Sequence, residues 1–424
     1  SRNGERERLQ MRRTQMPLFA PETEWVAPHE LKDLSGIKEV AIDLETNDPE
    51  LMTLGSGNVI GRGHIAGVAV AIEGWSGYYP IGHEGGGNMD RKLVLEWVQD
   101  LVNQEKTTFI FHNAMYDVCW LRQAGIKIRG KIVDTMIAAS LIDENRMSYQ
   151  LNTLAKHYVG IGKDEKVLQE AAKSYSVNPK SEMYKLPAMY VGEYAERDAE
   201  ATLKLWQRLS TELVSQELMD VFNLETKLFP CLVDMRFKGV RVDLEHAAKL
   251  KKNLIVRENK ILSKIKELTG INVEIHAARS IAKAFDKLKL PYDRTEKSNE
   301  PSFTKNFLQN HPHELARSIA DAREINKAHT TFIDSITKHS AKGRIHADIN
   351  QIRSDQGGTV TGRFSMSNPN LQQIPARHPE IGPMIRSIFI PEEKTVWGSF
   401  DYSQQEPRIL VHYAKLQNLD GVDE

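Results

Sequence analysis

The sequence predicts an α/β domain, followed by a mostly helical region and then by a short α+β region. The first part of the chain alternates β-rich runs with helical patterns. Beyond about Gln216 strands become scarce and long helical patterns take over. Near the end, short β-rich runs return after a loop rich in glycine, serine and asparagine. At 424 residues the chain is too long for one core, so we expect two or three domains.

Three β-rich runs and four helical patterns justify the α/β prediction. The strands are expected at Val40–Leu44, Ile65–Ile72 and Thr108–Phe111. The middle run is entirely apolar, which is typical of a strand that is covered on both faces. The helices are expected at Arg91–Val102, Ala114–Ala124, Thr135–Asp143 and Val191–Leu213.

The helical region begins with two long patterns, Leu224–Arg236 and Asp243–Leu268. The second pattern is rich in lysine. Either a solvated helix face or a basic stripe along a DNA backbone explains those lysines. Shorter helical patterns follow at Phe303–Asn310 and His313–Ile336.

The last region is less regular. A polar loop runs from Ser354 to Asn370. After it, Ser387–Ile390 and Val396–Phe400 predict two strands, and a helix is expected after Ser403.

Composition and charge limit the function classes. The hydrophobic content of 40% and the charged content of 27% are ordinary for a globular protein. The formal net charge is −1, so a nucleic-acid binder would need local basic faces. Residues 1–20 are strongly charged, and we expect a flexible arm over residues 1–24.

The cysteines and the apolar segments predict the compartment. Cys119 and Cys231 both lie in apolar contexts, which predicts buried thiols in a reducing environment. No stretch has the length and apolarity of a membrane span, and the N-terminus has no signal-peptide core. We therefore expect a cytoplasmic protein without a membrane partner.

Two carboxylates on the first predicted strand form the first candidate site. Asp43 and Glu45 are two residues apart, so their side chains lie on one face of the strand and can reach the same pair of metal ions. Carboxylates are the ligands that Mg²⁺ prefers, together with oxygens of a phosphate substrate. The pattern alone is a weak signal, because Asp-x-Glu is common in acidic loops.

Two further motifs strengthen this site. Asn113 stands where a helix N-cap is expected, with Asp117 one turn later, although a simple capped helix also explains the pair. Tyr194 and Asp198 are four residues apart and share a helix face, although a packed tyrosine beside a solvated aspartate also explains them. All three motifs in order on strand, helix and helix favour a shared acidic site.

The set Asp43, Glu45, Asp117 and Asp198, with Tyr194, resembles the DEDD superfamily of 3′–5′ exonucleases, in its tyrosine-bearing subtype. The resemblance implies a ribonuclease H-like exonuclease domain over residues 25–212. It also implies that the four acids hold two Mg²⁺ or Mn²⁺ ions and that the tyrosine orients the attacking water.

Two neighbouring residues receive weaker assignments. By the same resemblance, Asn113 contacts the single-stranded DNA substrate, although a helix cap is the safer assignment. Asp134 falls where the superfamily often has an acid, and we interpret it as a supporting or structural residue.

The octapeptide Asp401-Tyr402-Ser403-Gln404-Gln405-Glu406-Pro407-Arg408 is the second candidate site. A capping box explains Ser403 and Glu406, but not a carboxylate at the end of a strand. The octapeptide resembles motif A of the family A DNA polymerases, from which Gln405 and Pro407 depart. With the segments before it, the resemblance covers about residues 25–424.

This second resemblance implies a role for each matching residue. Asp401 and the backbone carbonyl of Tyr402 would bind a metal ion for nucleotidyl transfer. Glu406 would be a steric gate against the 2′ position of the incoming nucleotide. Four polar residues would hold the primer and the template: Arg363, Asn370, Gln372 and Arg386.

The resemblance also divides residues 213–424, which would be the N-terminal part of a polymerase domain. The mostly helical thumb would span about residues 245–340. The incomplete α+β palm would span about residues 213–244 and 341–424.

The family's nucleotide-binding fingers helix and second catalytic aspartate follow motif A, and neither is found before Glu424. One carboxylate cannot build a two-metal site. We therefore expect either a truncated chain or one half of a phage-like replicative enzyme, completed by a C-terminal polymerase polypeptide. Two alternatives remain open: a stand-alone RNase D-like exonuclease, and a non-catalytic scaffold for a partner polymerase half.

Overall fold

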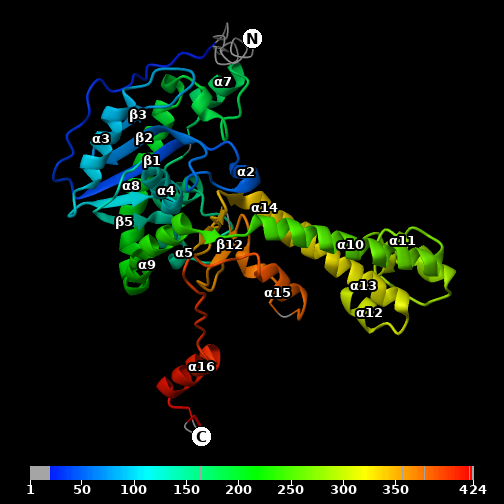
Figure 1. The fold of residues 1–424 in the computed structure, drawn as a ribbon. Helices are drawn as coiled ribbons and strands as arrows, with labels where there is room; N and C mark the ends of the chain where they lie inside the picture. Colours follow the sequence, from blue (N-terminus) through cyan, green and yellow to red (C-terminus); the bar gives the residue numbers. More distant parts are fainter. Residues whose placement is uncertain (1–19, 163, 356, 377, 420, 423–424) are drawn as a thin grey trace, which may run out of the picture.

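The computed structural model describes residues 20–422, except residues 163, 356, 377 and 420. Most of the predicted N-terminal arm, residues 1–19, lies outside the described residues. The described chain forms an α/β body, a long helical arm and a C-terminal segment that ends in helix α16 (Gln405–Leu416) (Figure 1).

A five-stranded sheet in the order β3-β2-β1-β4-β5 forms the centre of the α/β body. β1, β2 and β3 pair antiparallel in sequence, whereas β4 is parallel to both β1 and β5. The strands are β1 (Glu39–Asn47), β2 (His64–Ile72), β3 (Trp75–Pro80), β4 (Thr108–Phe111) and β5 (Lys131–Asp134). The three predicted strands are confirmed, and the sequence patterns miss β3 and β5.

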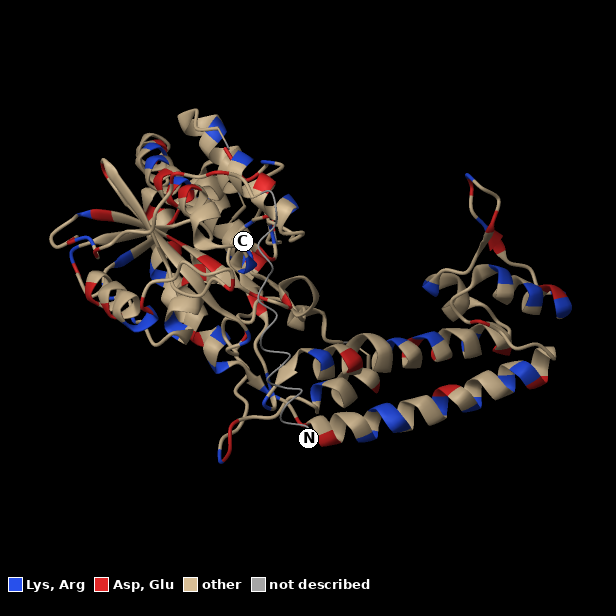
Figure 2. Cartoon of the chain, turned by 90° about the horizontal axis from the view of Figure 1, so that it is seen from above, with Lys and Arg blue, Asp and Glu red and all other residues tan. Residues whose placement is uncertain are grey.

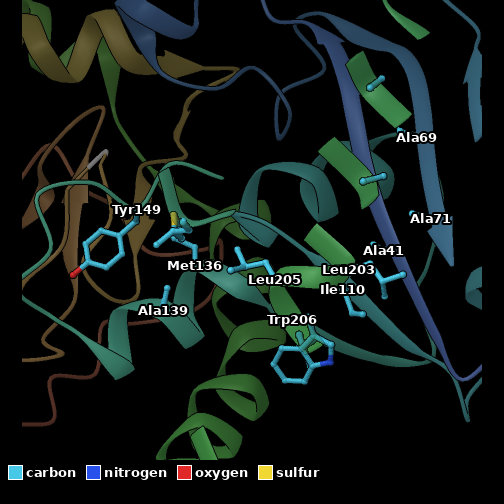
Figure 3. Packing of buried hydrophobic residues seen from close by; sticks show 14 of the residues in the cluster. Ala41, Ala69, Ala71, Ile110, Met136, Ala139, Tyr149, Leu203, Leu205 and Trp206 are labelled. Atoms are coloured by element: carbon cyan, nitrogen blue, oxygen red, sulfur yellow. The ribbon is translucent and has the colours of Figure 1, made fainter. Parts of the chain in front are cut away.

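Helices cover both faces of this sheet. Val40 and Ile42 of β1 pack toward α3 and α4, whereas Ala41, Ala69 and Ala71 pack toward α5, α6 and α8 (Figure 3). Small alanine side chains let α8 lie close to the strands. The helices are α3 (Arg91–Val102), α4 (Ala114–Gln123), α5 (Thr135–Ile142), α6 (Leu151–Val159) and α8 (Gly192–Ser215).

Shorter elements complete the α/β body. Helix α9 follows α8 and leads out of the body toward the arm (Figure 1). The remaining elements are α2 (Leu51–Leu54), α7 (Lys166–Ser174), the 3₁₀ turns η1 (Met183–Lys185) and η2 (Ala188–Tyr190), and α9 (Met219–Lys238).

Two long helices, α10 and α13, build the helical arm and run side by side in both views (Figures 1 and 2). Phe285 lies at the centre of an aromatic core at the far end of the arm, in contact with Phe303 and Phe307. The arm contains α10 (Leu244–Thr269), α11 (Ala278–Lys287), the strand pair β7 (Asp293–Arg294) and β8 (Pro301–Ser302), α12 (Lys305–Asn310), α13 (Glu314–Lys327), the π-helical turn η3 (Ala328–Ile333) and α14 (Asp334–His339).

The predicted helices of the arm are confirmed, although η3 interrupts the last one. Lys249 and Lys251 of α10 pair with Glu245 and Asp334 at 2.8 and 2.6 Å, and Lys264 pairs with an acid of α13. These pairs favour the solvated-face interpretation for three of the lysines. The basic stripe along DNA stays a prediction for the others.

Small sheets join the arm to the α/β body. One has the order β6-β10-β9, and β11 pairs antiparallel with β12. Isoleucine side chains, among them Ile345, Ile385 and Ile388, form the buried core beside these sheets. The elements are β6 (Val240–Arg241), β9 (Ser340–Ala341), β10 (Arg344–Ile345), β11 (Asp348–Asn350), β12 (Ser365–Ser367), the 3₁₀ turn η4 (Leu371–Gln373) and α15 (Ile381–Arg386).

The two strands predicted near the end of the chain do not form. In the segment Ser387–Ile390, only Phe389 makes a β-bridge, to Val242. Val396–Phe400 is not a strand, and its apolar side chains are exposed, Val396 at 88% and Phe400 at 97%. The prediction is wrong because a β-rich run needs a neighbouring strand to accept its backbone hydrogen bonds.

Two compositional predictions have different outcomes. Cys119 is buried as expected, whereas Cys231 is exposed. The error arises because Cys231 lies on the outward side of α9, although its neighbours Phe229 and Leu232 are buried. Within the described residues, no helix combines the length and the apolarity that crossing a bilayer requires.

Candidate active site

Strand β1 delivers the first two acids to the face that packs toward α8. Asp43 is paired with Ala69 and Glu45 with Gly67 across β1 and β2. Since side chains alternate along a strand, Asp43 and Glu45 project to the same side as Ala41. The pairing register shifts just after Glu45, so a β-bulge ends the regular strand beside the second acid.

Helix α8 lies across that face and supplies Tyr194 and Asp198. Ala195 and Ala199, both fully buried, hold the helix against the sheet. Trp25 fastens the beginning of α8, because a Cβ atom at Gly192 would lie 2.0 Å from its ring. The tyrosine and the aspartate thus stay one turn apart above β1.

Asp117 of α4 reaches the same place from the other side of the strand. β4 pairs with β1 only as far as Ala41, so the edge of β1 is free beyond it. The Asp117 side chain lies at this unpaired edge, where it accepts a hydrogen bond from the backbone N–H of Leu44. Its side chain is buried, with only 3% exposed.

Asp134, at the end of β5, fixes this arrangement. Its carboxylate accepts hydrogen bonds from the backbone N–H groups of Asn113 and Ala114 at 3.0 and 2.8 Å. It also caps α5 by accepting from the N–H of Met136 at 2.8 Å. Asp134 therefore anchors the beginnings of the two helices α4 and α5.

The predicted capping role of Asn113 is wrong. The residue does stand at the N-cap position of α4, but its side chain makes no capping hydrogen bond. Its backbone is in the left-handed region, with φ of 64°, which turns its N–H toward the carboxylate of Asp134. The acid from β5 therefore replaces the local cap that sequence spacing suggested.

The four acids Asp43, Glu45, Asp117 and Asp198, named here the acidic cluster, influence one another electrostatically. Burial raises the pKa of Asp43 well above its usual range, and the charges of the other three acids raise it further. Burial, and then the charge of Asp198, raise the pKa of Glu45 to about 8. Like charges that are removed from water need a cation or protons beside them.

Two more groups of the site have shifted pKa values. Burial first, and then the charge of Asp134, raise the pKa of Asp117 well above its usual range. Burial, the charge of Asp198 and a hydrogen bond with Asp198 raise the pKa of Tyr194. The Tyr194 hydroxyl therefore keeps its proton at neutral pH and can donate a hydrogen bond.

Sequence reasoning misses a tyrosine and a histidine that lie behind the acidic cluster. The Tyr78 hydroxyl and the Nε2 atom of His83 are 2.6 Å apart, and both side chains are buried. The charges of Glu45 and Asp43 raise the pKa of Tyr78, after burial. The available signal was the run Tyr-Tyr-Pro-Ile-Gly-His, which follows the second predicted strand.

A cavity of about 600 Å³ opens beside Glu45, between the α/β body and the sheet of β11 and β12. Asn113, Tyr116 and Asn368 line it. Arg236 of α9 lies at its wall, with 3% of its side chain exposed, and pairs with Asp348 at 2.7 Å. The cavity is therefore the place where the two main regions of the chain meet.

The residues of the second predicted site are not gathered in the same way. Asp401 and Tyr402 are exposed, and no strand precedes them. The predicted capping box is wrong, because α16 begins after Gln404, in the left-handed region, without a side-chain cap. Glu406 pairs instead with Arg363, and both side chains are mostly exposed.

The other three predicted DNA contacts lie between β12 and the end of α15: Asn370 precedes η4, Gln372 lies within it and Arg386 ends α15. The Asn370 side chain accepts a hydrogen bond from the N–H of Gln372 at 3.0 Å. The Gln372 side chain donates to the carbonyl of Phe364 at 3.0 Å. Arg386 donates to the carbonyl of Pro375 at 3.1 Å. These bonds shape the surface of the loops and leave the roles of the residues open.

Two family models match the chain in succession. The model described as 3′–5′ exonuclease matches residues 28–214, and the model described as DNA polymerase family A matches residues 244–421. The chain belongs to DNA polymerase family A. The acidic cluster lies within the stretch that matches the exonuclease model.

Two phage DNA polymerases are similar to the chain over most of its length. A DNA-directed DNA polymerase of Pseudomonas phage M6 is 38% identical over 95% of this chain and 63% of its own length. The DNA polymerase DpoZ of Salmonella phage PMBT28 is 31% identical over 91% of this chain and 63% of its own length. This family A chain thus spans less than two thirds of the length of either phage relative.

A solved structure shares the fold. The POL domain of Pol1 from M. smegmatis, in complex with DNA primer-template and dNTP, matches with a TM-score of 0.66. The match has 20% sequence identity and covers 91% of this chain and 62% of that chain. The family A chain therefore shares the fold of this POL domain over most of its length.

Proposed function

We propose that the α/β body is a 3′–5′ exonuclease that removes nucleotides from the 3′ end of single-stranded DNA. The single observation that carries the proposal is the convergence of four carboxylates from β1, α4 and α8. They meet within electrostatic range of one another, in the stretch that matches the exonuclease model.

The donor chemistry of the acidic cluster fits two Mg²⁺ or Mn²⁺ ions. Hard carboxylate oxygens suit these ions, and among the described residues no donor hydrogen bonds to the carboxylates of Asp43 or Glu45. As the side chains stand, no three acids, histidines or cysteines in the described part are placed to hold a metal ion. Phosphate oxygens of the DNA would then complete the coordination.

Bound cations would activate a water molecule and stabilise the departing 3′ oxygen. The residues of the chain hold and align the reactants. Asp43, Glu45, Asp117 and Asp198 bind the cations. The Tyr194 hydroxyl keeps its proton and donates it to Asp198, so its oxygen would accept a hydrogen bond from the attacking water and orient it.

The domain limits follow as part of the proposal. Residues 25–212 form the exonuclease domain, and residues 213–424 form the N-terminal part of a polymerase domain. The helical arm, about residues 245–340, would be the thumb. Residues 213–244 and 341–424 would belong to the palm. The succession of the two matched stretches supports this division.

In the polymerase part, Asp401 and the Tyr402 carbonyl would bind a metal ion, and Glu406 would exclude ribonucleotides. Primer and template would be held by Arg363, Asn370, Gln372 and Arg386. Because Asp401 and Tyr402 are exposed here, this site needs further structure around it. We propose that a C-terminal polymerase segment supplies it, within the same polypeptide or as a partner. The cytoplasmic location stays a prediction.

A nuclease assay tests the exonuclease proposal. We expect the purified chain with Mn²⁺ to shorten 5′-labelled single-stranded DNA stepwise from its 3′ end, and Asp43→Asn to abolish this activity. Asp100→Asn, on the exposed side of α3, is the matched control and should keep full activity. Absence of DNA cleavage would leave the scaffold alternative, and equally fast cleavage of RNA would favour the RNase D-like alternative.

A further inference from the structure

A buried hydrogen-bonded chain runs behind the acidic cluster. The Tyr78 hydroxyl contacts Nε2 of His83 at 2.6 Å, and Nδ1 of His83 contacts the carbonyl oxygen of Leu186 at 3.0 Å. Asn88 holds the backbone of His83 from both sides, with hydrogen bonds of 2.7 Å to its N–H and to its carbonyl. The histidine is therefore fixed on both its ring and its backbone.

These contacts define where the protons lie. A carbonyl oxygen can only accept, so Nδ1 of His83 carries the proton and donates it to Leu186. Burial lowers the pKa of His83 to about 4, so the ring is neutral and its Nε2 atom is an acceptor. The Tyr78 hydroxyl must then donate its single proton to His83.

Tyr78 stands beside Glu45 in the sheet. Asp43, Ala69 and Tyr78 form one row across β1, β2 and β3, and Glu45 is paired with Gly67 in the next row. A Cβ atom on Gly67 would lie 2.0 Å from the Tyr78 hydroxyl oxygen, so the hydroxyl occupies the space above this glycine. Directly paired positions have Cβ atoms about 5 Å apart, which brings the hydroxyl next to the Glu45 side chain.

A free tyrosine hydroxyl at this position would donate to the Glu45 carboxylate. Such a charge-assisted hydrogen bond is strong and would compete with a cation for the same oxygens. With its proton committed to His83, Tyr78 presents only lone pairs and offers Glu45 no donor.

We propose that His83 is a positioning residue that turns the Tyr78 proton away from Glu45 and thereby keeps the Glu45 carboxylate available to a divalent cation. This inference rests on the proposed exonuclease function. In this role neither His83 nor Tyr78 touches the substrate.

Direct titration of the full chain with Mn²⁺, by calorimetry, tests the proposal. His83→Leu frees the Tyr78 hydroxyl, and we expect Mn²⁺ to bind about tenfold more weakly, as one charged hydrogen bond must be displaced. Tyr78→Phe removes the competing donor and should leave the affinity unchanged. The double variant Tyr78→Phe/His83→Leu should then recover the affinity that His83→Leu loses.

This recovery separates the proposal from a structural role. If His83 served only for packing, the double variant would bind Mn²⁺ as weakly as His83→Leu or more weakly. His83→Gln, whose amide can donate to Leu186 and accept from Tyr78, should keep the wild-type affinity. Asp43→Asn gives the background binding, and thermal unfolding in EDTA checks that each variant folds.

The outcomes also separate this inference from the proposed function. If the wild-type chain neither binds Mn²⁺ nor cleaves DNA, the exonuclease proposal itself fails. If it does both and His83→Leu binds Mn²⁺ equally well, only the inference is overturned. Should His83→Leu not fold, Tyr78→Phe still decides, because weaker Mn²⁺ binding by this variant contradicts the proposal.

Discussion

Strand β1 and the segment Val396–Phe400 carry the same local signal with opposite results. Each is a short apolar run that ends in a carboxylate, Asp43 in one and Asp401 in the other. In the α/β body, β2 pairs with β1 at Asp43 itself, and β4 pairs with β1 as far as Ala41, so the acid is held in place. Near the end of the chain no strand of the described residues pairs with the run, and its acid is exposed. A catalytic carboxylate is thus positioned by the partners of its strand.

The largest expected effect tests whether the acids of the two regions differ in function. Asp117→Asn keeps the shape of the side chain but removes one charge from the acidic cluster. We expect the rate of DNA cleavage to fall about a thousandfold, since several kcal/mol of transition-state stabilisation is lost. Asp401→Asn should leave the rate unchanged. Single-turnover cleavage of a labelled strand measures both, and a similar loss in the two variants would contradict the comparison.

The junction between the two regions should be the next most sensitive place. Arg236 is buried and pairs with Asp348, so Arg236→Ala leaves a carboxylate without its partner. We expect a loss of about 3 kcal/mol in the free energy of unfolding, measured by urea denaturation. The exposed pair Arg257–Glu380 provides the control, and Arg257→Ala should cost less than about 1 kcal/mol.

The residues directly before Asp43 and Asp401 are the most closely matched pair for comparing the stability of the two regions. Ile42 precedes Asp43 and is fully buried, whereas Phe400 precedes Asp401 and is 97% exposed. Ile42→Ala should lower the free energy of unfolding by about 2–5 kcal/mol, because it opens a cavity in the core. Phe400→Ala should change it by less than about 0.5 kcal/mol. A large loss in the second variant would mean that the segment packs in solution.

The same contrast explains how much could be predicted from sequence. Hydrophobic periodicity located β1, β2, β4 and the helices that carry Asp117 and Asp198, because burial on one face leaves a local pattern. Periodicity failed where contacts between residues far apart in the sequence determine the structure. The carboxylate of Asp134 takes over the cap expected of Asn113, and the position of Tyr78 follows from a register across three strands.

The last effect concerns pH and connects stability with the cluster. Burial and like charge raise the pKa of Glu45 from 4.5 to about 8 in the folded chain, so folding holds a proton that the unfolded chain releases. Without divalent cations, the contribution of this group to stability should therefore be full below about pH 4.5 and be lost as the pH rises to about 8.

The expected slope is at most about 1.4 kcal/mol per pH unit for each proton released. Melting temperatures in EDTA between pH 5 and pH 8 measure it, and Glu45→Gln should flatten the slope because that side chain cannot titrate. Mn²⁺ should restore much of the stability lost at pH 8, since the cation replaces the protons between the carboxylates. A slope that is the same in Glu45→Gln would show that these acids do not share one buried site.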